Sequence, residues 1–210
     1  VISTGTFYGC SNLKQISLPE KLDSISTMAF GNCKSLTEIK LNDGLRVIES
    51  TAFSGCSALE FINIPQSVDY IGISAFADCS SLKELTLYEG VEDCHSIFLS
   101  LDANCGLKKL TVHFNKFPMM FLSDCVNLEE LILKEGLEVF QGVSNLEETP
   151  KLKELVIPST IQEMDLYKNS LTKLYIKSKN PPITGSWFEE YCENCTLYVP
   201  KGCKETYISI

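Results

Sequence analysis

Apolar residues recur along this 210-residue chain at a fixed interval of 23 positions. In each copy a phenylalanine is followed by a cysteine three residues later, by a leucine after three more, and then by two aliphatic residues one position apart. Alternate residues of a β-strand lie on the same face, so the aliphatic pair predicts one short strand per copy. In the first four copies these positions are Phe7, Phe30, Phe53 and Phe76; Cys10, Cys33, Cys56 and Cys79; Leu13, Leu36, Leu59 and Leu82; Ile16, Ile39, Ile62 and Leu85; and Leu18, Leu41, Ile64 and Leu87.

The other apolar residues of each copy are three or four positions apart, as Leu45, Ile48 and Phe53 are in the second copy. This spacing favours an irregular or 3₁₀-like return path over a second long element. A single coil buries too little apolar surface to be stable alone, so the coils must stack. A period of about 20–29 residues with an L-x-x-L-x-L core predicts a leucine-rich repeat solenoid.

The strand position continues to the end of the chain, with gaps between 19 and 25 residues. We expect about nine stacked coils of about 23 residues in one domain, residues 1–210, of the α/β horseshoe-like class: mostly short parallel strands with irregular or 3₁₀ return segments. The repeats are regular over 7–94 and degenerate over 95–180, and a closing repeat covers 181–210. The strand anchors are Ile16, Ile39, Ile62, Leu85, Leu110, Leu131, Leu155, Leu174 and Leu197.

The chain begins in the middle of a coil, because Ile2 and Phe7 have the same spacing as Ile25 and Phe30. Either an upstream coil has been removed or an atypical cap starts here; the apolar surface of an open solenoid end favours the first interpretation.

Composition narrows the choice of partners. The net charge is −9 and the pI is about 4.8, which disfavours nucleic acid because phosphate binding requires a basic patch. No run of 18 apolar residues is present, so we expect no insertion of this chain into a membrane.

The third copy carries a family resemblance. Phe53-Ser54-Gly55-Cys56 begins a phrase that is similar to the BspA-like (Treponema pallidum-type) leucine-rich repeat. The resemblance is strict over 7–94 and looser afterwards. It implies a secreted or cell-surface protein, typical of bacteria of the mouth and gut and of some parasitic protists, that functions in adhesion to host matrix proteins or other cells. The matching positions are Leu59, Ile62, Ile64-Pro65, Val68, Ile71 and Ala75-Phe76, and, in the closing repeat, Asn180-Pro181-Pro182-Ile183, Thr196–Cys203 and Tyr207.

The ten cysteines favour a core role over a disulfide framework. Cys10, Cys33, Cys56, Cys79, Cys105 and Cys125 share one repeat position, where stacked Cβ atoms point the same way about 4.8 Å apart; disulfides need closer, crossed vectors. Cys94 falls at another core position. Cys192-x-x-Cys195, with Cys203 nearby, leaves a zinc site, a local disulfide and free thiols open, although a fourth zinc ligand is missing.

No catalytic motif is present. His95 and Cys94 are adjacent and so face opposite sides of a strand, and His113 should project from the exposed face as a surface imidazole. Glu147-Glu148 and Glu189-Glu190 are explained by solvated charge. We therefore expect no enzyme activity, no metal and no cofactor.

The middle residues of the exposed strand face change from polar to apolar along the chain. Ser17, Lys40, Asn63, Thr86 and Thr111 are followed by Ile132, Val156, Tyr175 and Tyr198. An apolar stripe rimmed by charge often marks a protein contact, and Tyr is a favoured anchor. The alternatives are that loops cover the stripe or that it reflects ordinary β-propensity. The flanking charged residues are Glu130, Glu154, Lys173, Lys134 and Lys177.

The sequence thus predicts a binding module, with Ile132, Val156, Tyr175, Tyr198 and Lys173 as candidate contacts for a protein, such as a host matrix or cell-surface protein, or for a glycan. A structural spacer that presents another domain and an accessory repeat region of a larger enzyme are the alternatives.

Overall fold

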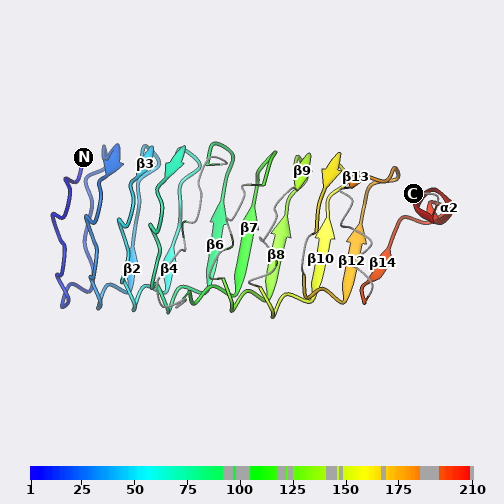
Figure 1. The fold of residues 1–210 in the computed structure, drawn as a ribbon. Helices are drawn as coiled ribbons and strands as arrows, with labels where there is room; N and C mark the ends of the chain where they lie inside the picture. The colour runs from blue at the N-terminus through cyan, green and yellow to red at the C-terminus, as the bar shows by residue number, and fades with distance from the viewer. Residues whose placement is uncertain are drawn as a thin grey trace.

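In the computed structural model the chain forms an elongated solenoid, in which successive coils follow one another from the N-terminus at one end to the C-terminus at the other (Figure 1). The structure describes residues 1–91, 97, 105–117, 122, 125–140, 146, 149–166, 169–184 and 194–208.

The main sheet contains the predicted strands. All of its strands are parallel and successive coils pair in register, so that Leu85 lies beside Leu110 and Leu155 beside Leu174. It has a two-stranded part, order β2-β4, and a six-stranded part, order β14-β12-β10-β8-β7-β6. The strands are β2 (Glu38–Ile39), β4 (Phe61–Ile62), β6 (Glu84–Leu87), β7 (Lys109–Val112), β8 (Glu130–Leu133), β10 (Glu154–Ile157), β12 (Lys173–Ile176) and β14 (Thr196–Tyr198).

The predicted solenoid of short parallel strands is confirmed, but the count of nine coils is slightly too high. The anchor Ile16 lies outside every strand, and the continuous part of the main sheet has six strands.

Strand length follows the β-propensity of the middle residue. Ser17, Lys40 and Asn63 are poor strand formers, and their coils have no strand or strands of two residues. From Thr86 onward the middle residues are β-branched or aromatic, and β6, β7, β8, β10 and β12 have four residues each. The continuous sheet therefore begins at Thr86, two coils before the middle residues become apolar at Ile132.

The return path consists of turns and of two-residue parallel strands. Ile25, Ile48 and Ile71 stand in register in one small sheet, and a second small sheet, order β13-β11-β9, continues the same side of the solenoid. A helix, α2 (Lys204–Ile208), follows the last strand (Figure 1). The short strands are β1 (Ser24–Ile25), β3 (Val47–Ile48), β5 (Tyr70–Ile71), β9 (Val139–Phe140), β11 (Glu163–Met164) and β13 (Ile183–Thr184).

Between the sheets one apolar core extends from Ile2 to Ile176. In the regular half it is a column of phenylalanine rings that stack nearly parallel, with centroids 5.3 Å apart for Phe30 and Phe53 and 5.7 Å apart for Phe53 and Phe76. Each ring therefore contacts the coils before and after its own, which ties neighbouring repeats together.

The shared cysteine column belongs to this core, as the sequence predicted. Cys33, Cys56, Cys79, Cys105 and Cys125 are buried, and the described cysteines carry free thiols. The Cys56 thiol donates to the carbonyl of Phe30, 3.1 Å away in the preceding coil. Cys10, in the first coil, differs from the prediction because it is exposed.

Candidate functional site

The main sheet places the four candidate apolar residues in one row. Ile132 lies beside Val156, Val156 beside Tyr175, and Tyr175 beside Tyr198, each on the next strand of the series β8, β10, β12 and β14. Parallel strands are about 4.8 Å apart, so the row extends for about 15 Å across the sheet. We refer to these four residues as the apolar row.

The apolar row is accessible to a partner. Val156 is 40% exposed and Tyr198 is 42% exposed, while Ile132 and Tyr175 are half-buried. The rings of Tyr175 and Tyr198 stack with centroids 4.5 Å apart and an angle of 14° between their planes. No described loop covers the row, and stacking restricts the two tyrosine rings.

Charged residues beside the apolar row are paired along the sheet. Lys109 contacts Glu130 at 3.1 Å, and Lys173 contacts Glu154 at 2.6 Å. The hydrogen bond and the charge of Glu154 raise the pKa of Lys173. Lys173, which the sequence suggested as a contact, is thus an ion-pair partner of the neighbouring strand, and its side chain is 42% exposed.

The two ion pairs point away from each other, and a groove lies between β8 and β10. Glu130 and Glu154 stand beside each other on these strands, but Glu130 contacts β7 and Glu154 contacts β12. The groove has a volume of about 530 Å³ and is lined by Ile132 and Val156. Its charged lining is balanced between Glu129, Glu130 and Glu154 and the lysines Lys151, Lys153 and Lys177.

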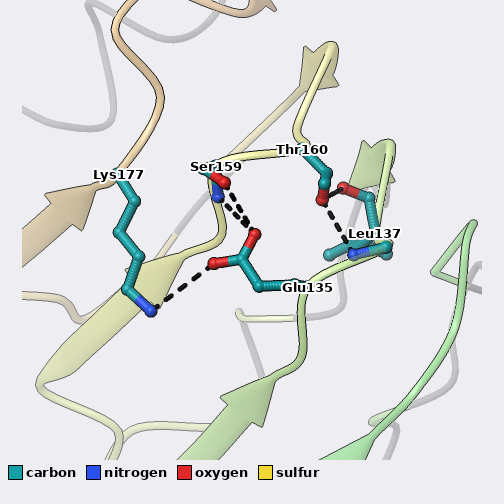
Figure 2. A network of polar contacts seen from close by, with 6 residues as sticks. Glu135, Leu137, Ser159, Thr160 and Lys177 are labelled. Carbon is teal, nitrogen blue, oxygen red and sulfur yellow. Dashed lines mark hydrogen bonds and ion pairs between the residues drawn. The ribbon is translucent and has the colours of Figure 1, made fainter.

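A polar network shares Lys177 with the lining of the groove (Figure 2). Glu135, in the turn after β8, accepts hydrogen bonds from the backbone N–H and the hydroxyl of Ser159 at 2.9 and 2.8 Å, and Lys177 approaches it at 3.6 Å. Partial burial raises the pKa of Glu135, but the bonds from Ser159 and the charge of Lys177 outweigh this effect, so the pKa lies below its ordinary value. Thr160 donates to the Leu137 carbonyl at 2.7 Å. The network joins three coils.

The other residues with possible reactivity that the structure describes lie apart from one another along the chain. His113 is half-buried and stacks on Tyr88 at 4.9 Å. Among the described residues, no group of three metal-ligating side chains occurs. Cys195 and Cys203 are partly exposed, whereas Cys94, His95, Cys192, Glu147-Glu148 and Glu189-Glu190 lie outside the described residues.

The sequence pattern did not identify one exposed residue on the sheet face, Phe61. Phe61 is 67% exposed in the column of the sheet face that holds Glu38 before it and Glu84 after it. An aromatic residue at a position that is charged in the neighbouring repeats was the signal that could have identified it.

The stacked coils and their in-register parallel strands define a leucine-rich repeat protein. The family model for the BspA-type leucine-rich repeat region matches residues 1–116, 100–168 and 116–207 in six copies, so the chain belongs to this family. Proteins of this family are generally non-enzymatic, protein-binding repeat modules.

Two solved structures illustrate the relationship. A leucine-rich repeat protein from T. pallidum is 31% identical, with a TM-score of 0.59, and the match covers 71% of this chain and 69% of that protein. A leucine-rich repeat protein from Bacteroides ovatus is 20% identical with a TM-score of 0.65; the match covers 94% of this chain but 63% of that protein, and it shows the fold alone. Among curated proteins, no relative matches the chain. No helix in the described segments has the length and hydrophobicity to cross a bilayer.

Proposed function

We propose that this chain is a non-enzymatic module of a secreted or cell-surface protein that binds a partner protein through the apolar row. The observation that carries the proposal is the in-register row itself, in which Val156 and Tyr198 remain about two-fifths exposed beside half-buried Ile132 and Tyr175. Exposed apolar surface rimmed by charge is typical of protein contacts.

The energetic centre of this contact is the pair Tyr175 and Tyr198. Tyr is enriched among residues that dominate binding energy, because it buries a large area and loses little conformational freedom. Stacking at 4.5 Å restricts both rings before a partner arrives. The entropy cost of ordering them on binding is correspondingly reduced.

The charged residues beside the row have a different role. Lys173 and Glu154 satisfy each other, and Lys177 is held by Glu135. Such exposed pairs contribute little affinity but affect association rate and selectivity. The proposed partner is a matrix or cell-surface protein that presents an extended apolar strip to the row, with polar groups over Lys173 and Lys177.

The test is surface plasmon resonance with purified fibronectin, fibrinogen, laminin and type I collagen. The unmodified protein should bind at least one of them, and the double variant Tyr175→Ala, Tyr198→Ala should weaken that binding at least tenfold. Tyr70→Ala is the matched control, since Tyr70 is 44% exposed on the other side of the solenoid.

Charge reversal provides an independent check. Lys173→Glu places like charges beside Glu154 and should slow association, and the swap Lys173→Glu, Glu154→Lys should restore it. Binding that is unchanged in the double tyrosine variant would refute the proposed surface, and no binding to any of the four proteins would favour a spacer role.

A further inference from the structure

A second surface on the same sheet face lies in the regular half, around Phe61. Phe61 is in β4 and pairs in register with Glu38 of β2, while its neighbour Ile62 is buried. The side chain is 67% exposed on a part of the sheet that is otherwise polar. Single exposed apolar residues are common on protein surfaces, so a role for Phe61 has to follow from what its ring borders.

Phe61 borders two hollows. One, of about 550 Å³, spans the first three coils and is lined by Gln15, Ser17, Glu38, Lys40, Phe61 and Asn63, over a floor of Ile16 and Ile39. The other, of about 170 Å³, lies between Phe61 and β6. The ring is thus an aromatic wall of a shallow groove large enough for a small ligand, since ligand sites commonly measure about 300–1,000 Å³. We refer to the larger hollow as the Phe61 groove.

The polar lining of the Phe61 groove is neutral and rich in hydrogen-bonding groups. Glu38 and Lys40 cancel in charge, and the amides of Gln15 and Asn63 and the hydroxyl of Ser17 complete the lining. Gln15 donates to Glu38 at 3.0 Å, which orients the carboxylate. Within the described coils, the side chains of Lys40 and Asn63 make no hydrogen bond or ion pair, so their donors and acceptors can turn to a ligand.

We propose that the Phe61 groove binds one or two neutral pyranose units of an oligosaccharide. The face of an aromatic ring carries negative charge density and attracts the weakly positive C–H groups on the flat side of a sugar ring. Amide, carboxylate, hydroxyl and ammonium groups supply the donors and acceptors that sugar hydroxyls require.

The composition of the groove argues against other ligands. A charged ligand would find no excess of opposite charge, because Glu38 and Lys40 balance. An apolar peptide would bury the polar groups of Lys40 and Asn63 without partners, which is unfavourable. A neutral polyhydroxylated ring with one apolar side needs no excess of charge in the groove and offers hydrogen-bonding partners to Lys40 and Asn63.

This site is independent of the apolar row. β2 and β4 form their own two-stranded sheet, and β8, β10, β12 and β14 lie farther along the solenoid (Figure 1). Loss of sugar binding would leave the protein contact on the apolar row unaffected, and the reverse also holds.

The test is saturation-transfer difference NMR with the full chain and four neutral disaccharides: cellobiose, lactose, N,N′-diacetylchitobiose and maltose. At least one should receive saturation on its ring C–H protons. Phe61→Ala should weaken binding about fivefold or more, while Phe61→Trp should retain it, because aromatic contacts are worth about 0.5–1.5 kcal/mol.

Matched variants separate the stacking contact from a change in folding. Tyr198→Ala removes an exposed aromatic residue of the apolar row and should leave the sugar signal unchanged. Asn63→Ala should weaken it without changing the melting temperature, since Asn63 is exposed. Absence of saturation for all four disaccharides, or an equal signal in Phe61→Ala, would overturn the proposal.

Discussion

The two halves of this solenoid share one repeat but differ in how regular their core is and in which side chains their sheet face exposes. In the N-terminal half, repeats of equal length stack phenylalanine on phenylalanine and thiol on carbonyl, while the exposed sheet face is polar and the strands are short. In the C-terminal half the spacing varies, the core is less uniform, and the exposed face is a continuous sheet with an apolar row. Repeats of equal length allow identical side chains to stack in the core, whereas the less regular repeats carry the apolar row on the surface.

The cysteine column gives the largest expected contrast. Burial raises the pKa of Cys56 to about 12, so its thiolate fraction at neutral pH is about a thousandfold below that of an ordinary cysteine. Iodoacetamide should therefore modify exposed Cys10 in the folded protein and Cys56 only after denaturation, as measured by mass spectrometry of tryptic peptides. Equal labelling of the two would mean that the column is open.

The next largest effect is expected from substitutions in the phenylalanine column of the core. Phe53 is fully buried between Phe30 and Phe76, so Phe53→Ala should reduce the free energy of unfolding by about 4 kcal/mol. Phe140→Ala in the irregular half should cost about 1 kcal/mol less, because Phe140 contacts one described ring, Phe117, and each aromatic pair is worth about 0.5–1.5 kcal/mol. Urea denaturation of both variants measures the difference, and an equal cost would show that regular stacking adds no stability.

Close contact between coils makes Gly72 sensitive to substitution. A Cβ atom at Gly72 would lie 2.3 Å from the backbone nitrogen of Ser50 in the preceding coil. Gly72→Ala should therefore cost about 3 kcal/mol. Gly44→Ala is the control, because its Cβ would meet only the side chain of Asn42 at 3.2 Å. A small effect at Gly72 would indicate that the coils separate easily.

A left-handed backbone occurs at two positions in each regular coil, and the residue type varies at the first of them. Gly5 occupies it in the first coil, and Thr51 adopts it with a φ of 56° in the third. Relief of this strain in Thr51→Gly should raise stability by about 0.5–1 kcal/mol. Thr160→Gly in the irregular half, where the backbone is not left-handed, should lower the melting temperature instead. A decrease in both variants would contradict the assignment of strain.

The smallest expected effect concerns pH. The pKa of Glu135 is lowered in the folded protein, so its stabilising contribution is complete above the ordinary value of 4.5 and is lost as the pH falls below it. The contribution should be under about 1 kcal/mol because the carboxylate is exposed. Between pH 6 and pH 3 the melting temperature should fall more steeply for the unmodified protein than for Glu135→Gln. An equal fall in both would show that the Glu135 network does not contribute to stability.

Much of this fold follows from periodicity alone. The spacing of Ile39 and Leu41 and its repetition predicted the sheet, and the alternation of side chains predicted that Val156 and Tyr175 would be neighbours. The apolar row could be identified because register follows directly from the repeat. The count of coils was less accurate, because Ser17 gives the first anchor too little β-propensity to form a strand.

Other features depend on contacts that a pattern does not contain. The ion pair of Lys173 with Glu154 depends on side-chain conformations across two strands, and the sequence alone indicated only that both residues flank the apolar row. The left-handed conformation of Thr51 is imposed by the neighbouring coils against its own preference. Phe61 stands out only when its column is compared with the charged residues on either side.

The most direct test of the account compares the two halves on one molecule. Hydroxyl-radical footprinting of the complex with a bound matrix protein reports on the exposed aromatic side chains Tyr175 and Tyr198 in one half and Phe61 and Tyr70 in the other. The bound partner should reduce oxidation of Tyr175 and Tyr198 several-fold and leave oxidation of Phe61 and Tyr70 unchanged. Protection of Phe61 or Tyr70 without protection of Tyr198 would contradict this account.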